Sequence, residues 1–166
     1  MTSIESLTYR PCAGMMVINR AGLVFIGRRT SGPEHIDMKN DWQMPQGGID
    51  EGEDTYQAAL RELYEETNIK SVDKLGEIAG WLHYDIPREL ASQAWSGKYR
   101  GQKQKWYALR FTGKEDEIDP LTPRNGQPAE FDAWRWERLD RVADIVVPFR
   151  RDVYRAVAEQ FAPFAK

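Results

Sequence analysis

The 166-residue chain contains few of the residues that build disulfide frameworks and zinc sites: one cysteine, Cys12, and two histidines, His35 and His83. A single cysteine cannot form an intramolecular disulfide, and two separated histidines form no recognisable zinc site or Ser–His–Asp triad. We expect Cys12, which begins an apolar run, to be a small buried residue rather than a nucleophile. The chemistry of the chain must therefore come from other residue types.

Long apolar runs and a strong net charge are also missing. No stretch approaches the roughly 20 apolar residues of a membrane span, and residues 1–10 do not resemble a signal peptide. The formal charge of −3 argues against a protein that coats DNA or RNA, although gripping one phosphorylated end needs only local basic groups. We expect a cytoplasmic protein with no membrane or DNA partner, folded as one domain over residues 1–166.

Hydrophobic periodicity predicts more strands than helices. Apolar runs at 13–18 and 22–27 indicate a hairpin, and the polar segment 30–41 indicates a loop. Helices are expected at 54–67 and 149–162, and further extended segments at 42–45, 76–84, 103–112 and 131–137. This mixed order favours an α/β (α+β) fold in which helices cover a central mixed β-sheet.

The helix expected at 54–67 has one apolar and one acidic side. At 100° per residue, its apolar residues gather on the side that should pack on the sheet: Tyr56, Ala59, Leu60, Leu63 and Thr67. Glu62, Glu65 and Glu66 gather roughly 130° away, where spacings of three and four residues bring their carboxylates together. Such a cluster is either a solvated acidic face or a platform for a hard divalent cation shared with phosphates.

The turn before this helix favours the second interpretation. Gly47 and Gly48 allow the backbone to approach a ligand closely. Eight residues then match the Nudix box, a motif of Gly, five residues, Glu, seven residues and Arg-Glu-apolar-any-Glu-Glu-any-Gly-apolar: Gly47, Glu53, Arg61, Glu62, Leu63, Glu65, Glu66 and Ile69. The second glycine of the box is Asn68 here, and asparagine is the next-best residue for a left-handed helix C-cap.

The resemblance extends beyond the box. Segments 9–11, 42–48, 101–107, 130–136 and 147–154 stand in the order typical of one family, and together the chain resembles the bacterial RNA pyrophosphohydrolases over about residues 8–162. These enzymes are also described as (di)nucleoside polyphosphate hydrolases. The resemblance implies the Nudix α/β/α sandwich. The loop at 30–41 is longer than is usual in the family.

The same resemblance implies the site. Glu62, Glu65 and Glu66, with the carbonyl of Gly47, would bind Mg²⁺ or another divalent cation such as Mn²⁺. Glu130 would supply a further acidic ligand or the general base, and Glu53 would pair with Arg61 to orient the catalytic helix. The implied reaction is removal of pyrophosphate from the 5′-triphosphate end of RNA. Asymmetric cleavage of diadenosine tetraphosphate is the alternative, and a non-catalytic nucleotide or RNA sensor is a third reading.

A protein that reads phosphates also needs cations beside its metal site. The basic candidates are Arg10, Arg28, Arg29, Lys103, Lys105, Arg150 and Arg151. The last two are expected in the first turn of a helix, where cations oppose the helix dipole and so suggest a compensating anion. Spacing alone leaves Phe149 either buried or stacked on a base, and the resemblance favours base contacts for Phe149 and Val147.

Overall fold

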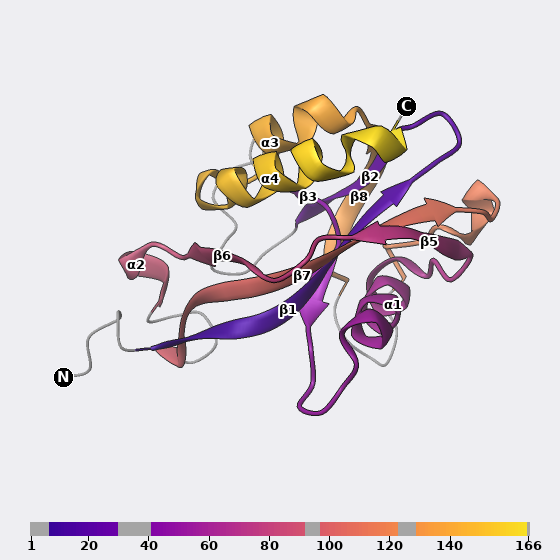
Figure 1. Ribbon diagram of the computed structural model, residues 1–166. Helices are drawn as coiled ribbons and strands as arrows, with labels where there is room; N and C mark the ends of the chain where they lie inside the picture. Colours follow the sequence, from indigo (N-terminus) through magenta and orange to yellow (C-terminus); the bar gives the residue numbers. More distant parts are fainter. Residues whose placement is uncertain (1–6, 30–40, 92–96, 123–128, 166) are drawn as a thin grey trace.

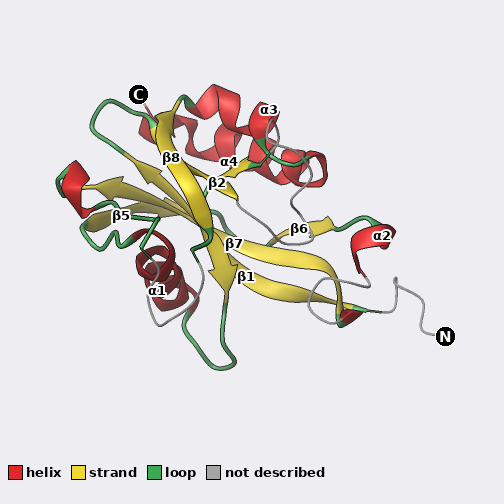
Figure 2. Ribbon diagram, turned by 180° about the vertical axis from the view of Figure 1, so that it is seen from behind, coloured by secondary structure: helices red, strands yellow, loops and turns green. Residues whose placement is uncertain are grey.

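The computed structural model describes residues 7–29, 41–91, 97–122 and 129–165, which form a sheet covered by helices on both faces (Figures 1 and 2). The expected α/β/α layering around a mixed sheet is therefore confirmed. The eight strands of this part of the chain are β1 (Thr8–Ile18), β2 (Val24–Arg29), β3 (Trp42–Gln43), β4 (Gln46–Gly48), β5 (Val72–Glu77), β6 (Leu82–Asp85), β7 (Tyr99–Phe111) and β8 (Phe131–Glu137).

The sheet is built around β1. Strands run in the order β3-β2-β1-β7-β5, with β4 paired to β1, β6 to β7 and β8 to β2. The β1–β7 pair is parallel and extends from Thr8 to Ile18, whereas the other pairs are antiparallel. This arrangement makes the sheet mixed. The long strand β1 runs through the core and also pairs with the Gln46–Gly48 strand.

Alternation along β1 supplies two hydrophobic cores. Met16 and Ile18 belong to a core cluster with α3 (Val142–Ile145) and α4 (Arg151–Phe161), while Met15 and Val17 belong to a second cluster with α1 (Thr55–Thr67). Successive strand residues point to opposite faces of a sheet, so a continuous apolar run fills both layers. Figure 1 shows α1 on one side of the strands and α3 and α4 on the other.

The helix expected at 54–67 is α1, and both of its ends are capped. The Asp54 side chain accepts a hydrogen bond from the backbone N–H of Gln57 at 3.0 Å, as a good N-cap residue does. At the other end Asn68 adopts the left-handed conformation with φ 65°, and its N–H bonds the carbonyl of Tyr64. The expected asparagine C-cap is confirmed.

Three boundaries differ from the expectations. The strand expected at 76–84 is two strands, β5 and β6, separated by Gly80 at φ 76°. The last helix begins as a 3-10 turn, Pro148–Arg150, before α4. The strand expected at 13–18 starts earlier, at Thr8, because it pairs with β7.

Several smaller elements complete the described chain: α2 (Arg88–Ala91) and the 3-10 turns Glu115–Glu117, Leu139–Arg141 and Ala162–Ala165. Residues 30–40 of the expected loop, and His35 within it, lie outside the described residues. Across the described ranges, no helix is both long and apolar enough to cross a membrane.

Candidate active site

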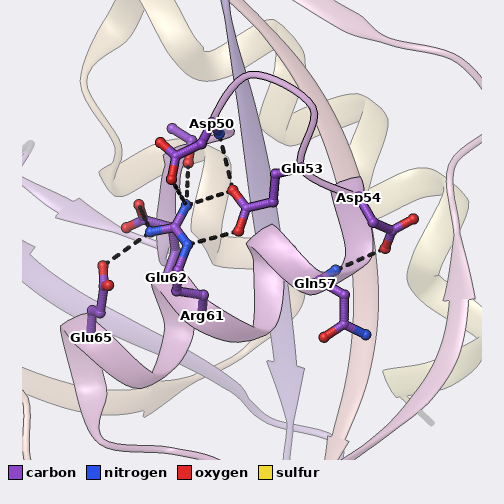
Figure 3. Close-up of polar contacts among 8 residues, drawn as sticks. Asp50, Glu53, Asp54, Gln57, Arg61, Glu62 and Glu65 are labelled. Carbon is purple, nitrogen blue, oxygen red and sulfur yellow. Dashed lines mark hydrogen bonds and ion pairs between the residues drawn. The ribbon is translucent and has the colours of Figure 1, made fainter.

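Arg61 connects the acidic loop before α1 to the glutamates on α1 (Figure 3). Its guanidinium donates to both carboxylate oxygens of Glu53 at 2.9 Å, so the expected Glu53–Arg61 pair is present. It also donates to Glu62 at 2.9 Å, to Glu65 at 3.2 Å and to the carbonyl of Gly48 at 3.0 Å. One cation therefore holds a loop carboxylate, two helix carboxylates and the catalytic turn in one arrangement.

The electrostatics of this pair are strong because the partners are in direct contact. The hydrogen bond from Arg61, followed by one from the backbone N–H of Asp50, lowers the pKa of Glu53 to about 2. The hydrogen bonds that Arg61 donates to Glu53 outweigh desolvation and raise the pKa of Arg61 further above its usual range. Both groups are therefore charged throughout the physiological range.

Glu66 carries the clearest sign of a ligand. Burial, followed by the negative charges of Glu130 and Glu62, raises the pKa of its carboxyl well above the ordinary value. The positive charge of Arg29 and a hydrogen bond from the Gln46 backbone only partly offset this. Within the described residues, the Oε2 atom of Glu66 is buried and has no hydrogen-bond partner. A buried carboxylate oxygen that lacks a partner requires a proton or a cation.

The surrounding groups fit a hard divalent cation. Glu130 lies close enough to raise the pKa of Glu66, although 64 residues separate them in sequence. A Cβ atom at Gly47 would collide with the Glu62 carboxylate, so only glycine permits this approach of turn and helix. These carboxylates and the turn's backbone are oxygen donors, which Mg²⁺ and Mn²⁺ prefer.

The carboxylates do not form a closed metal shell in this conformation. No group of three or more Asp, Glu, His or Cys side chains among the described residues converges as a ready ion site. Glu62 and Glu65 instead turn toward Arg61. Burial raises the pKa of Glu62, while Arg61 and, more weakly, Arg10 oppose that rise. A bound cation would compete with Arg61 for the same oxygens.

A buried amide cluster beside the catalytic turn was not foreseen from the sequence. Gln104 donates to Gln46 at 2.6 Å and to Gln102 at 2.8 Å, and it accepts from the Trp106 indole at 2.9 Å. The three glutamines are at most 7% exposed. A signal was present, because Gln102 and Gln104 occupy alternate positions of β7, in step with Trp106 and Ala108, which lie in the core. These bonds fix β4 against β7 next to the Gly47–Gly48 turn.

The basic residues predicted from the sequence separate into two groups. Arg10 lies against Gly48 and affects Glu62, so it is at the site. Arg28 points elsewhere, pairing with Asp132 at 2.7 Å. Its neighbour Arg29 pairs instead with Glu130 at 2.9 Å and so reaches the carboxylates. Consecutive strand residues point in opposite directions, which explains why Arg29 rather than Arg28 reaches the carboxylates.

The lysines on β7 also have separate environments. Lys105 donates to the carbonyl of Ile78 at 2.6 Å and pairs with Glu77 at 3.0 Å, so its charge is engaged away from the carboxylates. The ammonium group of Lys103 lies 4.7 Å from the ring centroid of Trp81. Within the described residues, neither lysine forms an ion pair with a glutamate of α1, and their phosphate contacts remain a prediction.

Arg150 is not an exposed anion ligand, in contrast to its sequence-based expectation. It is 1% exposed, and its guanidinium donates to the hydroxyl of Tyr84 at 3.1 Å and to Gln43 at 2.9 Å. Helix geometry explains the error: Pro148 starts a 3-10 turn that directs Arg150 inward. Phe149 stays partly exposed and lies 5.7 Å from the Tyr84 ring, whereas Val147 is buried in the core.

Comparisons with known proteins agree with this geometry. The model of the NUDIX domain family matches residues 8–157. The RNA pyrophosphohydrolase of Azorhizobium caulinodans is 62% identical over 166 residues, covering 99% of each chain. The RNA pyrophosphohydrolase of Rhodopseudomonas palustris is 58% identical, covering 100% of this chain and 95% of that one.

Solved structures with the same fold are more distant in sequence. The Escherichia coli dihydroneopterin triphosphate pyrophosphohydrolase has a TM-score of 0.67 at 20% identity, covering 93% of this chain and 97% of that one. A Caenorhabditis elegans Ap4A hydrolase binary complex has a TM-score of 0.60 at 18% identity, covering 92% and 98% respectively. At such identities the likeness shows the fold alone.

Proposed function

The chain belongs to the NUDIX family, and from that premise we propose that it removes pyrophosphate from the 5′-triphosphate end of RNA, leaving a 5′-monophosphate. The observation that carries the chemistry is the buried, unpartnered Oε2 atom of Glu66 beside Glu62 and Glu130. The choice of RNA is supported by full-length relatives of that name at 62% and 58% identity. On this proposal the whole chain, residues 1–166, acts as one domain in the cytoplasm and takes part in RNA decay.

The proposed cation is Mg²⁺ or Mn²⁺, held by Glu62, Glu65, Glu66, Glu130 and the carbonyl of Gly47. Such an ion supplies Lewis-acid charge and lowers the pKa of a bound water. The assignment is supported by the buried Oε2 atom of Glu66, which lacks a hydrogen-bond partner, and by the pKa of Glu66, which burial and the charges of Glu130 and Glu62 raise. Either Glu66 or Glu130 would then accept the proton of the attacking water.

The remaining residues position the substrate. Water attacks a phosphorus atom, the bond to the leaving phosphate oxygen breaks, and the products are a 5′-monophosphate end and pyrophosphate. Arg10, next to Gly48, would neutralise charge on the phosphates, and Arg61 would keep α1 aligned through Glu53. Phe149 would stack on a base, with Tyr84 behind it and the buried Arg150 holding Tyr84 in place.

Two other functions remain to be separated from this one. Asymmetric hydrolysis of dinucleoside polyphosphates uses the same glutamates and fold, and one solved structure of similar fold is named an Ap4A hydrolase. A non-catalytic sensor would have no need of an intact metal cluster, and the retention of Glu62, Glu65 and Glu66 argues against it.

The test is a Mg²⁺-dependent assay that compares kcat/KM for a short 5′-triphosphorylated RNA and for diadenosine tetraphosphate. Glu66→Gln serves as the blank, because it keeps the side chain's shape and removes the ligand charge. Faster pyrophosphate release from RNA supports the proposal. A strong preference for diadenosine tetraphosphate would make hydrolysis of dinucleoside polyphosphates the main function. Activity on neither substrate would favour a non-catalytic sensor.

A further inference from the structure

Gln43 on β3 lies between two arginines that reach opposite ends of the candidate site. Its amide Oε1 atom accepts hydrogen bonds from Nη1 of Arg150 at 2.9 Å and from Nη1 of Arg29 at 3.4 Å. Arg150 also donates to the hydroxyl of Tyr84, whose ring centroid lies 5.7 Å from that of Phe149. One neutral amide oxygen therefore joins the surface at Phe149 to the side of the site that carries the carboxylates.

Arg29 connects Gln43 to those carboxylates. The Nη1 atom of Arg29 that donates to Gln43 also pairs with Oε1 of Glu130 at 2.9 Å. A terminal guanidinium nitrogen carries two N–H bonds, so it can serve both acceptors. Burial and the charge of Glu130 raise the pKa of Glu66, and the charge of Arg29 opposes that rise. Arg29 therefore offsets the repulsion between the two carboxylates.

The two guanidinium groups fix the orientation of the Gln43 amide. Guanidinium nitrogens only donate hydrogen bonds, so the amide atom that faces both arginines is the oxygen, and Nε2 points away from them. Gln43 is 3% exposed, and its buried Nε2 atom has no hydrogen-bond partner among the described residues. An unpaired buried donor destabilises the folded state, so the amide at this position is unfavourable for the fold.

The backbone around Gln43 is held on both sides of the residue. Gln43 pairs with Gly27 of β2 in the sheet. The following N–H group, of Met44, donates to the hydroxyl of Tyr154 on α4 at 2.9 Å. The position of the amide is therefore set by the sheet and by α4, and the oxygen is presented to the two arginines from a fixed backbone.

A glutamate would suit the fold better than this glutamine. A carboxylate has the same shape, accepts from both guanidinium groups and has no donor to leave unpaired. It would also compete with Glu130 for Arg29, because a charged acceptor binds a guanidinium more strongly than an amide does. We propose that Gln43 is a positioning residue, whose uncharged amide oxygen holds Arg29 without drawing it away from Glu130. The inference rests on the proposed function, since Glu130 is one of the groups proposed to act there.

The role of Gln43 is indirect. Its buried amide reaches the reaction only through Arg29 and Glu130, so a replacement displaces a group that acts on the metal or the attacking water. The residues proposed to contact the substrate, Arg10 and Phe149, keep their places. A change at Gln43 should therefore appear in kcat, with little effect on KM.

The main variant is Gln43→Glu, assayed on a short 5′-triphosphorylated RNA at saturating Mg²⁺. The introduced carboxylate should lower kcat by roughly tenfold, because small displacements of a catalytic group have effects of this order. KM should change by less than about twofold. The urea midpoint of unfolding should equal or exceed that of the wild type, since the unpaired donor is gone and both arginines gain a charged partner.

Two further variants show whether charge or packing is responsible. Gln43→Met keeps the size of the side chain but loses both hydrogen bonds, so it should be less stable than Gln43→Glu and yet retain more of the wild-type kcat. Gln160→Glu adds the same charge at an exposed position of α4 and should change neither quantity. If Gln43→Glu loses both stability and kcat, and Gln43→Met ranks above it in both, Gln43 is a structural residue only and the proposal is overturned.

A double variant tests the route through Arg29. Arg29→Gln alone should lower kcat, and adding Gln43→Glu to it should cause no further loss, because the contact that the carboxylate disturbs is already absent. Independent, multiplying losses from the two substitutions would show that Gln43 acts without Arg29, which contradicts the proposal.

Crystal structures of the wild type and of Gln43→Glu give a readout that does not depend on turnover. Arg29 should contact Glu130 in the wild type and the introduced carboxylate in the variant. An unchanged pair of Arg29 and Glu130 in the variant would overturn the inference and leave the RNA function intact. If the wild type hydrolyses no substrate, the proposed function fails, and the position of Arg29 in the two structures still decides the inference.

Discussion

The guanidinium of Arg61 and the carboxylate of Glu53 form a two-point ion pair, with Nε–Oε2 and Nη2–Oε1 distances of 2.9 Å each. The pair joins the loop before α1 to the middle of α1, and the same guanidinium holds Glu62, Glu65 and the carbonyl of Gly48. A planar guanidinium can make all of these contacts at once, whereas a lysine ammonium cannot match the geometry. The spacing between the loop and the glutamates of α1 thus depends on one residue.

Replacing Glu53 by glutamine should reduce activity and change the acid stability of the protein. The pKa of Glu53 is lowered to about 2, so its stabilising effect is present above the ordinary carboxyl pKa and is lost as pH falls toward about 2. Wild-type protein should therefore lose about 1–2 kcal/mol more than Glu53→Gln between about pH 5 and about pH 2.5, once solvent screening is allowed for. Urea unfolding at several pH values measures this.

The control for that series is Glu51→Gln, which changes an exposed carboxylate of the same loop. The free energy of unfolding of this variant should change with pH as that of the wild type does. Parallel wild-type and Glu53→Gln curves would mean that the ion pair with Arg61 is not maintained in solution.

Glu66→Gln should abolish turnover without destabilising the fold. In metal-free buffer near neutral pH the buried Glu66 carboxylate is costly, since its pKa is raised by burial and by Glu130 and Glu62. A carboxyl with a raised folded-state pKa loses stability as pH rises above its unfolded pKa, so the variant should be more stable by about 1 kcal/mol or more. Turnover should nevertheless fall to near the background.

Adding Mg²⁺ should reverse the order of stability. Binding to the folded state raises the free energy of unfolding by roughly 2.7 kcal/mol at a hundredfold excess over Kd, and the variant should lack most of that gain. Thermal unfolding with and without Mg²⁺ measures it, with Glu159→Gln, an exposed residue of α4, as control. An equal Mg²⁺ response in Glu66→Gln would remove Glu66 from the ligand set.

The sequence was sufficient for the catalytic helix because its determinants are local. The motif from Gly47 to Ile69 contains the turn, the apolar face and the C-cap Asn68, and the structure has each of these in the expected place. Asp54, expected as the first residue of the helix, is its N-cap instead. The Glu53–Arg61 pair follows from the same local spacing. Helices with strong caps and clear periodicity depend little on distant partners.

Long-range pairing set the features that the sequence did not reveal. The extra N-terminal residues of β1 are polar or small and become a strand only because β7 lies beside them in parallel. The exchange of Arg28 for Arg29 at the site depends on which face of β2 meets Glu130. The buried contacts of Arg150 with Gln43 and Tyr84 join positions 107 and 66 residues apart. Local patterns carry no signal for such partners.

Arg150→Ala should lower the free energy of unfolding more than it weakens substrate binding. The side chain is 1% exposed and bonds Tyr84 and Gln43, so truncation removes both buried hydrogen bonds and opens a void. A cost of about 2–4 kcal/mol is expected from these losses. Urea unfolding, with KM for triphosphorylated RNA measured in parallel, tests this. Unchanged stability with a raised KM would instead assign Arg150 to the phosphate chain.

The comparison variant for this prediction is Arg155→Ala on α4, the helix that directly follows Arg150. Arg155 pairs with Asp152 at 3.0 Å, but both side chains are largely exposed, at 63% and 97%. Exposed pairs of this kind contribute little, so the free energy of unfolding should change by less than about 0.5 kcal/mol. A loss as large as that from Arg150→Ala would show that any arginine removed from this helix destabilises it.

Asn68 has two separable roles at the end of α1. Its backbone is in the left-handed region at φ 65°, and its side-chain amide donates to the carbonyls of Asp119 at 2.6 Å and Thr122 at 3.3 Å. Glycine accepts the backbone conformation without strain but loses both hydrogen bonds, whereas alanine loses the bonds and incurs the strain. Asn68→Ala should therefore be less stable than Asn68→Gly by about 1 kcal/mol.

Urea unfolding of the two variants measures that difference, and turnover under saturating Mg²⁺ provides the second readout. Both variants should retain wild-type kcat, because Asn68 supplies no metal oxygen and its position lies beyond the last glutamate of the motif. Equal stability of the two variants would contradict the left-handed cap. A fall in kcat in both variants, with Asn68→Gly as stable as the wild type, would mean that the bonds to Asp119 and Thr122 hold the end of α1 in position, which makes the asparagine an active substitute for glycine in the motif rather than a tolerated one.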